Sequence, residues 1–174
     1  MKKLLSFALA AALCAPAFAQ KMGSTNGNAP ALAQSITIGD AKMSLDYTSI
    51  TWADGKTMTA IADKEKGGRA RERVNRTAAN APLGKFTTSI DCKCGDATLA
   101  AGSYDVFFTV GDDLGWSLNF KSGDKVTTTK LELKSGDHES KRLQMLLHAT
   151  DDGAGAWLSF GKMSGMLADR KSVV

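Results

Sequence analysis

Residues 104–120, YDVFFTVGDDLGWSLNF, decide the fold class of this chain. Apolar side chains occupy alternate positions on either side of the turn-forming stretch 111–115; they are Tyr104, Val106, Phe108, Val110, Trp116, Leu118 and Phe120. Successive side chains of a β-strand point to opposite faces, so a period of two predicts two strands that each bury one face. The Gly- and Asp-rich stretch between them predicts a β-hairpin.

The same alternation recurs on both sides of this hairpin. Residues 36–38 and 43–47 flank the two-residue turn signal Gly39-Asp40, and further strand patterns cover residues 126–134, 143–147, 157–160 and 163–168. We therefore expect an all-β fold, a single antiparallel β-sandwich or barrel-like domain over residues 35–174. Its predicted core comprises Ile36, Ile38, Met43, Leu45, Tyr104, Val106, Phe108, Trp116, Leu118, Phe120, Leu131, Leu133, Leu143, Met145, Leu147, Leu158 and Phe160.

The N-terminus has the layout of a secretory signal peptide. Lys2 and Lys3 precede a mostly apolar run, and Ala17-Phe18-Ala19 supplies the small residues of a cleavage site before Gln20. The apolar run is shorter than the roughly 20 residues that span a bilayer, which argues against a membrane span. We expect residues 1–19 to be removed and the protein to be periplasmic or secreted in a bacterium.

Two segments lack a clear period. Residues 20–34 are polar and Gly-rich, which predicts a flexible leader. Residues 53–74 contain a charge run broken by Gly67 and Gly68, which we interpret as a mobile loop rather than a short helix.

Composition excludes several classes of function. The net charge of +4 gives no reason to expect a nucleic-acid partner, and two of the positive charges leave with the signal. The sequence contains no nucleophile elbow, phosphate-binding glycine loop or metalloprotease motif, and its paired aspartates lie in turns, where Asp is favoured for backbone reasons. We therefore predict no catalytic residue, cofactor or metal ligand set.

Cys92-Lys93-Cys94 is a stretch whose two cysteines could form a disulfide or bind a metal. In a strand the two sulfurs share a face, with Cα atoms about 6.6 Å apart, near the upper limit for a disulfide. A local disulfide and two half-buried thiols are both consistent with this spacing. A redox switch or a soft-metal site is the functional alternative, although nothing in the sequence brings His148, Met145, Met163 or Met166 to the thiols.

Part of the chain resembles a known family. The residues that carry the likeness are Arg76-Thr77-Ala78-Ala79-Asn80, Phe86-Thr87-Thr88, residues 99–108, Trp116-Ser117-Leu118-Asn119-Phe120 and residues 156–162. They resemble the bacterial exported proteins of the domain of unknown function 2911 family. Asn75 and Ala78 stand where that family has Trp and Gly. The resemblance implies an exported all-β protein and no particular activity.

Arg76 and Asn80 are the predicted binding residues. On a loop or strand end they would present a guanidinium and an amide to one anionic or polar ligand, while Arg69, Arg71 and Arg73 extend a basic stretch that suits an anion, a lipid headgroup or a cell-wall polymer. Our leading hypothesis is a non-catalytic periplasmic binding or interaction module, whose partner is a small molecule, an envelope polymer or a protein. The alternatives are an envelope hydrolase near Arg76 and Asn80, and a redox or copper-handling protein that uses Cys92 and Cys94.

Overall fold

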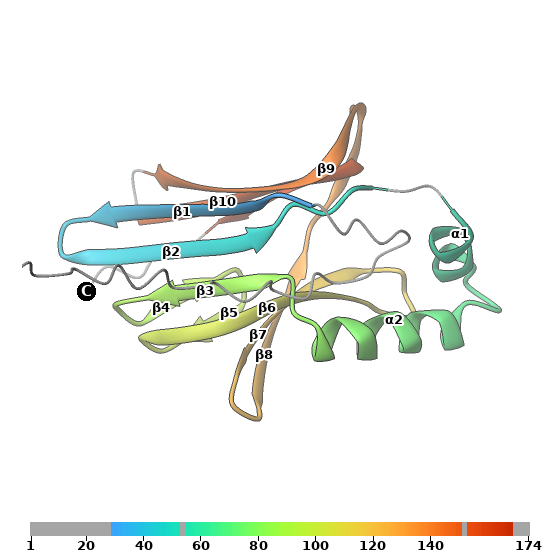
Figure 1. Cartoon of the computed structure of the whole chain (residues 1–174), viewed down its shortest axis with the longest axis horizontal. Helices are drawn as coiled ribbons and strands as arrows, with labels where there is room; N and C mark the ends of the chain where they lie inside the picture. Colours follow the sequence, from blue (N-terminus) through green and yellow to red (C-terminus); the bar gives the residue numbers. More distant parts are fainter. Residues whose placement is uncertain (1–28, 53–54, 151–152, 169–174) are drawn as a thin grey trace, which may run out of the picture.

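The fold is antiparallel and mostly β, as the alternating sequence pattern predicts (Figure 1). The structure is a computed structural model that describes residues 29–52, 55–150 and 153–168. The predicted signal peptide, residues 20–28 of the predicted leader and residues 169–174 lie outside the described residues. No helix in these described ranges is long and apolar enough to cross a membrane.

Six strands form one sheet in the order β1-β2-β3-β6-β7-β8, with every neighbouring pair antiparallel. Their bounds are β1 Ala31–Ile38, β2 Ala41–Thr48, β3 Gly84–Thr88, β6 Gly102–Val110, β7 Trp116–Ser122 and β8 Lys125–Leu131. Short turns join three of the pairs. At Gly39 and Gly123 the backbone has φ of 58°, a left-handed conformation that glycine adopts without steric cost. These turns confirm the predicted hairpins.

Two smaller pairs of strands complete the β structure. The long hairpin of β9 (Lys134–Thr150) and β10 (Gly153–Ala168) contacts both β1 and β8, the two edge strands of the main sheet. The short hairpin of β4 (Cys92–Cys94) and β5 (Ala97–Leu99) connects β3 to β6 and contacts β8. In Figure 1, β1 and β2 lie with β9 and β10 in an upper layer, and β3 and β6–β8 form the lower layer.

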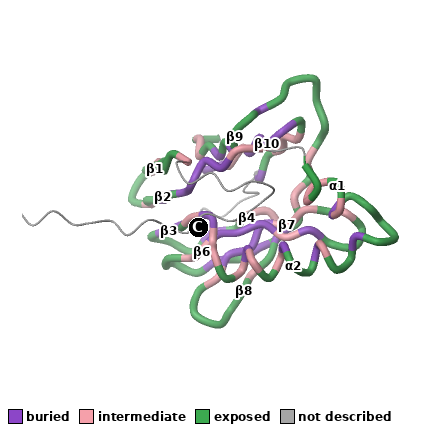
Figure 2. Tube along the Cα trace, turned by 45° about the vertical axis from the view of Figure 1, so that its right-hand side comes forward, coloured by how far each residue is buried: buried purple, intermediate pink, exposed green. Residues whose placement is uncertain are grey.

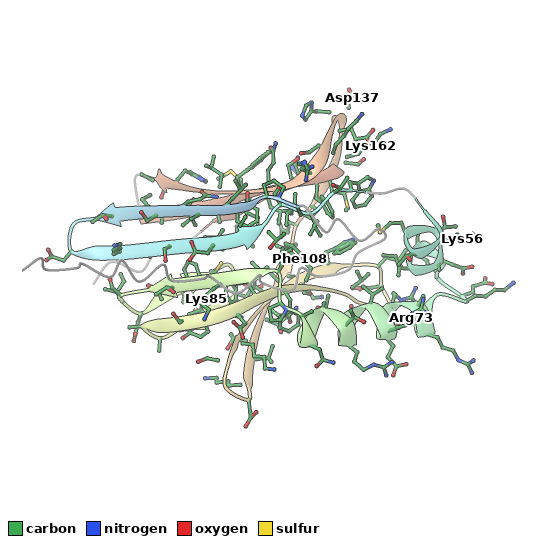
Figure 3. The ribbon with its side chains drawn as sticks, in the orientation of Figure 1. Lys56, Arg73, Lys85, Phe108, Asp137 and Lys162 are labelled. Carbon is green, nitrogen blue, oxygen red and sulfur yellow. The ribbon has the colours of Figure 1, made fainter. Side chains whose placement is uncertain are left out.

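The core lies between these layers, and it contains all of the side chains predicted for it. Those that are not fully buried, such as Ile36 and Trp116, still pack against the buried cluster. Figure 2 shows the buried residues concentrated along the strands, and Figure 3 places Phe108 in the middle of the molecule while Lys56, Arg73, Asp137 and Lys162 lie at its periphery. The structure adds Leu83, Phe86 and Leu99 to the predicted core.

The prediction of a mobile loop over residues 53–74 was wrong. Residues Lys56–Ala62 form helix α1, and residues Gly68–Asn80 form helix α2. On α2, Arg71, Val74 and Ala78 are buried at a helical spacing. Val74 packs with Ile61 of α1 and Val110 of β6 in a second small apolar cluster, so the helices are fixed to the end of β6.

The predicted leader also ends earlier than expected. Residues 31–34 belong to β1, where Gln34 pairs with Leu45 of β2. The Gln34 side chain donates from Nε2 to the Met145 carbonyl and accepts a bond from the Leu147 N–H at 2.9 Å. These two side-chain bonds attach β1 to β9 without backbone pairing between the two strands. The β9–β10 hairpin therefore holds the start of β1 in place.

Candidate functional site

An apolar cavity of about 60 Å³ lies between the two layers and is the best candidate for a binding site. Its lining residues come from β2, β3, β6 and β7 of the main sheet, from β4, and from the β9–β10 hairpin. The lining residues are Met43, Leu45, Phe86, Cys92, Lys93, Cys94, Val106, Leu118, Phe120, Met145, Leu147, Ala154, Gly155, Ala156, Trp157, Leu158 and Leu167.

The walls of this cavity carry almost no charge. Among the described residues of its lining, Lys93 alone is charged, and because Lys93 is exposed, it marks a place where the cavity wall reaches the surface. The other polar side chains of the lining are the thiols of Cys92 and Cys94 and the indole of Trp157. Such a cavity favours a hydrocarbon-like occupant over water, which needs several hydrogen-bond partners.

The β4–β5 hairpin brings the two cysteines to the cavity. Cys92 and Cys94 lie on one face of β4, where Cys92 is buried and Cys94 half-buried, and both are thiols in this structure. The turn at Gly95 has φ of 59°, and the next backbone N–H, of Asp96, donates to Thr129 Oγ1 of β8 at 3.1 Å. A Cβ at Gly95 would lie 2.4 Å from that same oxygen, so glycine is required for the hairpin to sit this close to β8.

Arg76 and Asn80 lie elsewhere. Both are exposed on α2, four residues apart, and neither lines the cavity. The expectation that they sit on a loop or strand end was wrong, because residues 68–80 form a helix whose buried side is supplied by Arg71, Val74 and Ala78. A helix still places residues i and i+4 next to each other, so the pair can present a guanidinium and an amide together on the surface.

The basic stretch divides into one structural arginine and three exposed ones. Arg71 is buried, and its Nη1 donates to the carbonyls of Ile61 at 3.0 Å and Asp63 at 2.8 Å. Its Nε and Nη2 donate to Asp112 Oδ1 at 3.2 and 3.1 Å. Arg71 therefore satisfies carbonyls at the C-terminal end of α1, whereas Arg69, Arg73 and Arg76 are exposed on the outside of α2.

A polar hollow next to these residues is the second candidate. It lies between the start of α2 and the β6–β7 turn, and Arg69, Arg71, Glu72, Asn75 and Asp112 contribute to its lining. Arg71 and Asp112 are already paired with each other, and Asn75 holds the backbone of Val110 with two bonds of 2.9 Å. Most of the polar side chains of this hollow are thus bonded to other parts of the protein. Arg76 and Asn80 lie outside the hollow.

Sequence reasoning missed the cavity, although part of its signal was present. The period of two placed Met43 and Met145 on buried faces, but it could not show that β4 faces the same space. His148 does not line the cavity. Its ring packs against Gly155, on the face of the β9–β10 hairpin opposite Leu147. In the described part of the chain, no three His, Cys, Asp or Glu side chains gather as a metal site would require.

Comparison with known proteins adds no relative to this picture. No protein-family model matches the chain, and neither a curated protein nor a solved structure shows significant similarity to it.

Proposed function

We propose that this chain is a non-catalytic binding protein that holds a small apolar molecule in the cavity between its two layers. The observation that carries the proposal is the lining, which, over the described residues, consists of hydrocarbon and sulfur groups apart from Lys93 and the Trp157 indole. The cavity volume of about 60 Å³ exceeds the ~10–15 Å³ that one water requires, yet its walls offer water few hydrogen-bond partners. A hydrocarbon probe gains dispersion contacts there without losing hydrogen bonds.

The same lining favours binding over catalysis. General acid–base chemistry needs a titratable group within hydrogen-bond reach of the reacting atoms. Among the described residues that line this cavity, Lys93 and the two thiols offer such a group, and none is an Asp, Glu or His. A hydrolase centred on Arg76 and Asn80 has less support, because both residues lie outside the cavity and outside the polar hollow.

We propose further that the protein acts outside the cytosol, as a bacterial exported protein similar to the domain of unknown function 2911 family. The charged start, the apolar run and Ala17-Phe18-Ala19 support export. Intact mass measurement on protein recovered from the periplasm or medium tests this. A chain that begins at Gln20 is expected, and an uncut chain that stays in the cytosol would contradict the proposal.

Benzene is a suitable probe for the cavity. At a benzene concentration about tenfold above its Kd, we expect the free energy of unfolding to rise by about 1.4 kcal/mol, which raises Tm by roughly 3–6 °C in a chain of this size. Ala156→Leu adds a side chain to the cavity wall and should remove the benzene effect. Ala33→Leu, which adds the same three carbons at an exposed position of β1 outside the cavity lining, is the matched control and should keep it.

The outcome distinguishes the two candidate sites. A benzene response that Ala156→Leu abolishes and Ala33→Leu preserves supports the cavity. An unchanged response in Ala156→Leu, or no response in the parent chain, overturns the proposal. The same thermal-shift assay with anionic probes on the parent chain and Arg76→Ala tests the predicted site at Arg76 and Asn80.

A further inference from the structure

The lining of the cavity includes four sulfur-containing residues from three parts of the chain. Cys92 and Cys94 come from β4, Met43 from β2 and Met145 from β9, and all four side chains line the same space. Of the four, only Cys94 is more than slightly exposed. From this convergence we infer a binding site for a soft monovalent metal ion, Cu(I), with the two cysteine sulfurs as its principal ligands and the methionine thioethers beside them.

The ligand types select the metal. Thiolate and thioether sulfurs are soft donors that favour Cu(I), whereas imidazole and carboxylate donors suit Zn²⁺ and harder ions. A structural zinc site takes four ligands, almost always from Cys and His. In the part of the chain that the structure describes, two Cys line this cavity and no three His, Cys, Asp or Glu side chains form a cluster. The site therefore offers too few charged ligands for zinc and a suitable set for Cu(I).

Charge balance is consistent with one ion. When Cu(I) binds, both thiols lose a proton to solvent, and two thiolates with one Cu(I) leave a single negative charge. Lys93 lies between the two cysteines in sequence and contributes to the cavity lining, but its exposed side chain belongs to the opposite face of β4, so the remaining negative charge is balanced from solvent and not by a buried cation. The metal keeps its oxidation state, so the step requires no electron donor or acceptor.

The β4–β5 hairpin fixes the two thiols before any metal arrives. Cys92 pairs with Leu99 and Cys94 with Ala97, and the bond from Asp96 to Thr129 attaches the turn to β8. The buried side chains of Leu99 and Ala97 belong to the core, so core packing holds the hairpin in place. A preorganised pair of ligands loses less conformational freedom on binding, which favours affinity.

The inference goes beyond the apolar-ligand proposal, because it concerns a different ligand at the same cavity. Its test uses the reduced mature chain that begins at Gln20, in which Cys92 and Cys94 are the only thiols. This parent is titrated without oxygen against Cu(I) held by the chromogenic chelator bathocuproine disulfonate. We expect about one Cu(I) per chain to be withdrawn, and copper-edge X-ray absorption to show only sulfur neighbours.

Variants identify the ligands. Cys92→Ser with Cys94→Ser should abolish the withdrawal of copper, and Met145→Leu should weaken it by about tenfold, comparable to the loss of a group that supports a metal site. Met58→Leu on α1, outside the cavity, is the matched control and should bind like the parent. Circular dichroism confirms that each variant is folded.

Three results would overturn the site. They are a parent that takes no Cu(I) from the chelator, a double serine variant that still takes it, and native mass spectra in which copper appears only in dimers. The benzene assay separates this inference from the proposed function, because the double serine variant keeps the cavity and should keep its response to benzene. Loss of copper binding with benzene binding intact therefore concerns the thiols alone.

Discussion

At the scale of single residues, a few polar side chains satisfy backbone N–H and C=O groups that a neighbouring strand or helical turn would otherwise satisfy. Gln34 bonds a carbonyl and an N–H of β9, and Asn75 bonds the carbonyl and the N–H of Val110. A side-chain amide carries both a donor and an acceptor, so it can replace a neighbouring strand at one position. Arg71, which has donors only, satisfies backbone carbonyls at the end of α1.

Arg71→Ala should destabilise the fold although Arg71 lies in a run of charged residues. The substitution removes the Arg71 donor from the Ile61 carbonyl and one of two donors from the Asp63 carbonyl, which keeps the Gly67 N–H. We expect this to lower the free energy of unfolding by about 2–3 kcal/mol. The ion pair itself contributes little, because the Asp112 side chain is 90% exposed, so Asp112→Asn should cost less than about 1 kcal/mol. Urea denaturation measures both changes. Arg73→Ala, at an exposed site on the same helix, is the control, and equal losses for Arg71→Ala and Arg73→Ala would contradict this role.

At the scale of elements, the β9–β10 hairpin is long, bent and irregular in one place. Its register shifts on both sides of Gly161, where the backbone has φ of 61°. Trp52 lies over this glycine and meets the Phe160 ring edge-on, with centroids 4.9 Å apart. The bulge therefore allows the hairpin to bend around the segment that follows β2.

Gly161→Ala should destabilise the hairpin in two ways. A Cβ there would lie 2.7 Å from the Trp52 ring, and the left-handed backbone costs an L-residue roughly 1–2 kcal/mol. Gly136→Ala is the matched control, because it lies in the same hairpin with no atom within 4 Å of its added Cβ. We expect thermal unfolding to show a clear loss of Tm for Gly161→Ala and almost none for Gly136→Ala. A similar Tm for the two variants would mean that the bulge tolerates a side chain.

The same scale shows what the sequence could predict. The strands around Phe108 and Leu118 were predictable because each buries one face, and that burial imposes a period of two on the sequence. Helix α2 was not predicted, because its buried side consists of Arg71, Val74 and Ala78, of which only Val74 is a large aliphatic residue. The cavity depends on how β4, β9 and β10 meet across the layers, and no local pattern encodes such contacts.

At the scale of the whole molecule, a few specific contacts hold the β9–β10 hairpin to the main sheet. The Leu143 N–H donates to the Ile50 carbonyl and the Trp52 N–H to the Lys141 carbonyl, each at 2.8 Å. The Tyr47 hydroxyl accepts a bond from the Met145 N–H at 3.0 Å. These bonds fix the position of the hairpin together with the side-chain bonds that Gln34 and Ser49 make to β9, and the apolar side chains packed between the hairpin and the sheet add to the attachment.

Alternate side chains of β9 should therefore differ sharply in their contribution to stability. Leu143 is fully buried between the layers, and Leu143→Ala should lower the free energy of unfolding by about 2–5 kcal/mol. Leu146 lies on the outer face of the same strand with 51% of its surface exposed, so Leu146→Ala removes the same atoms at a cost of less than about 1 kcal/mol. Guanidinium titration of both variants, followed by tryptophan fluorescence, measures the difference. Leu143 and Leu146 lie on opposite faces of β9, so burial of one face alone requires unequal losses. Comparable losses at the two positions would contradict the packing of β9 against the sheet.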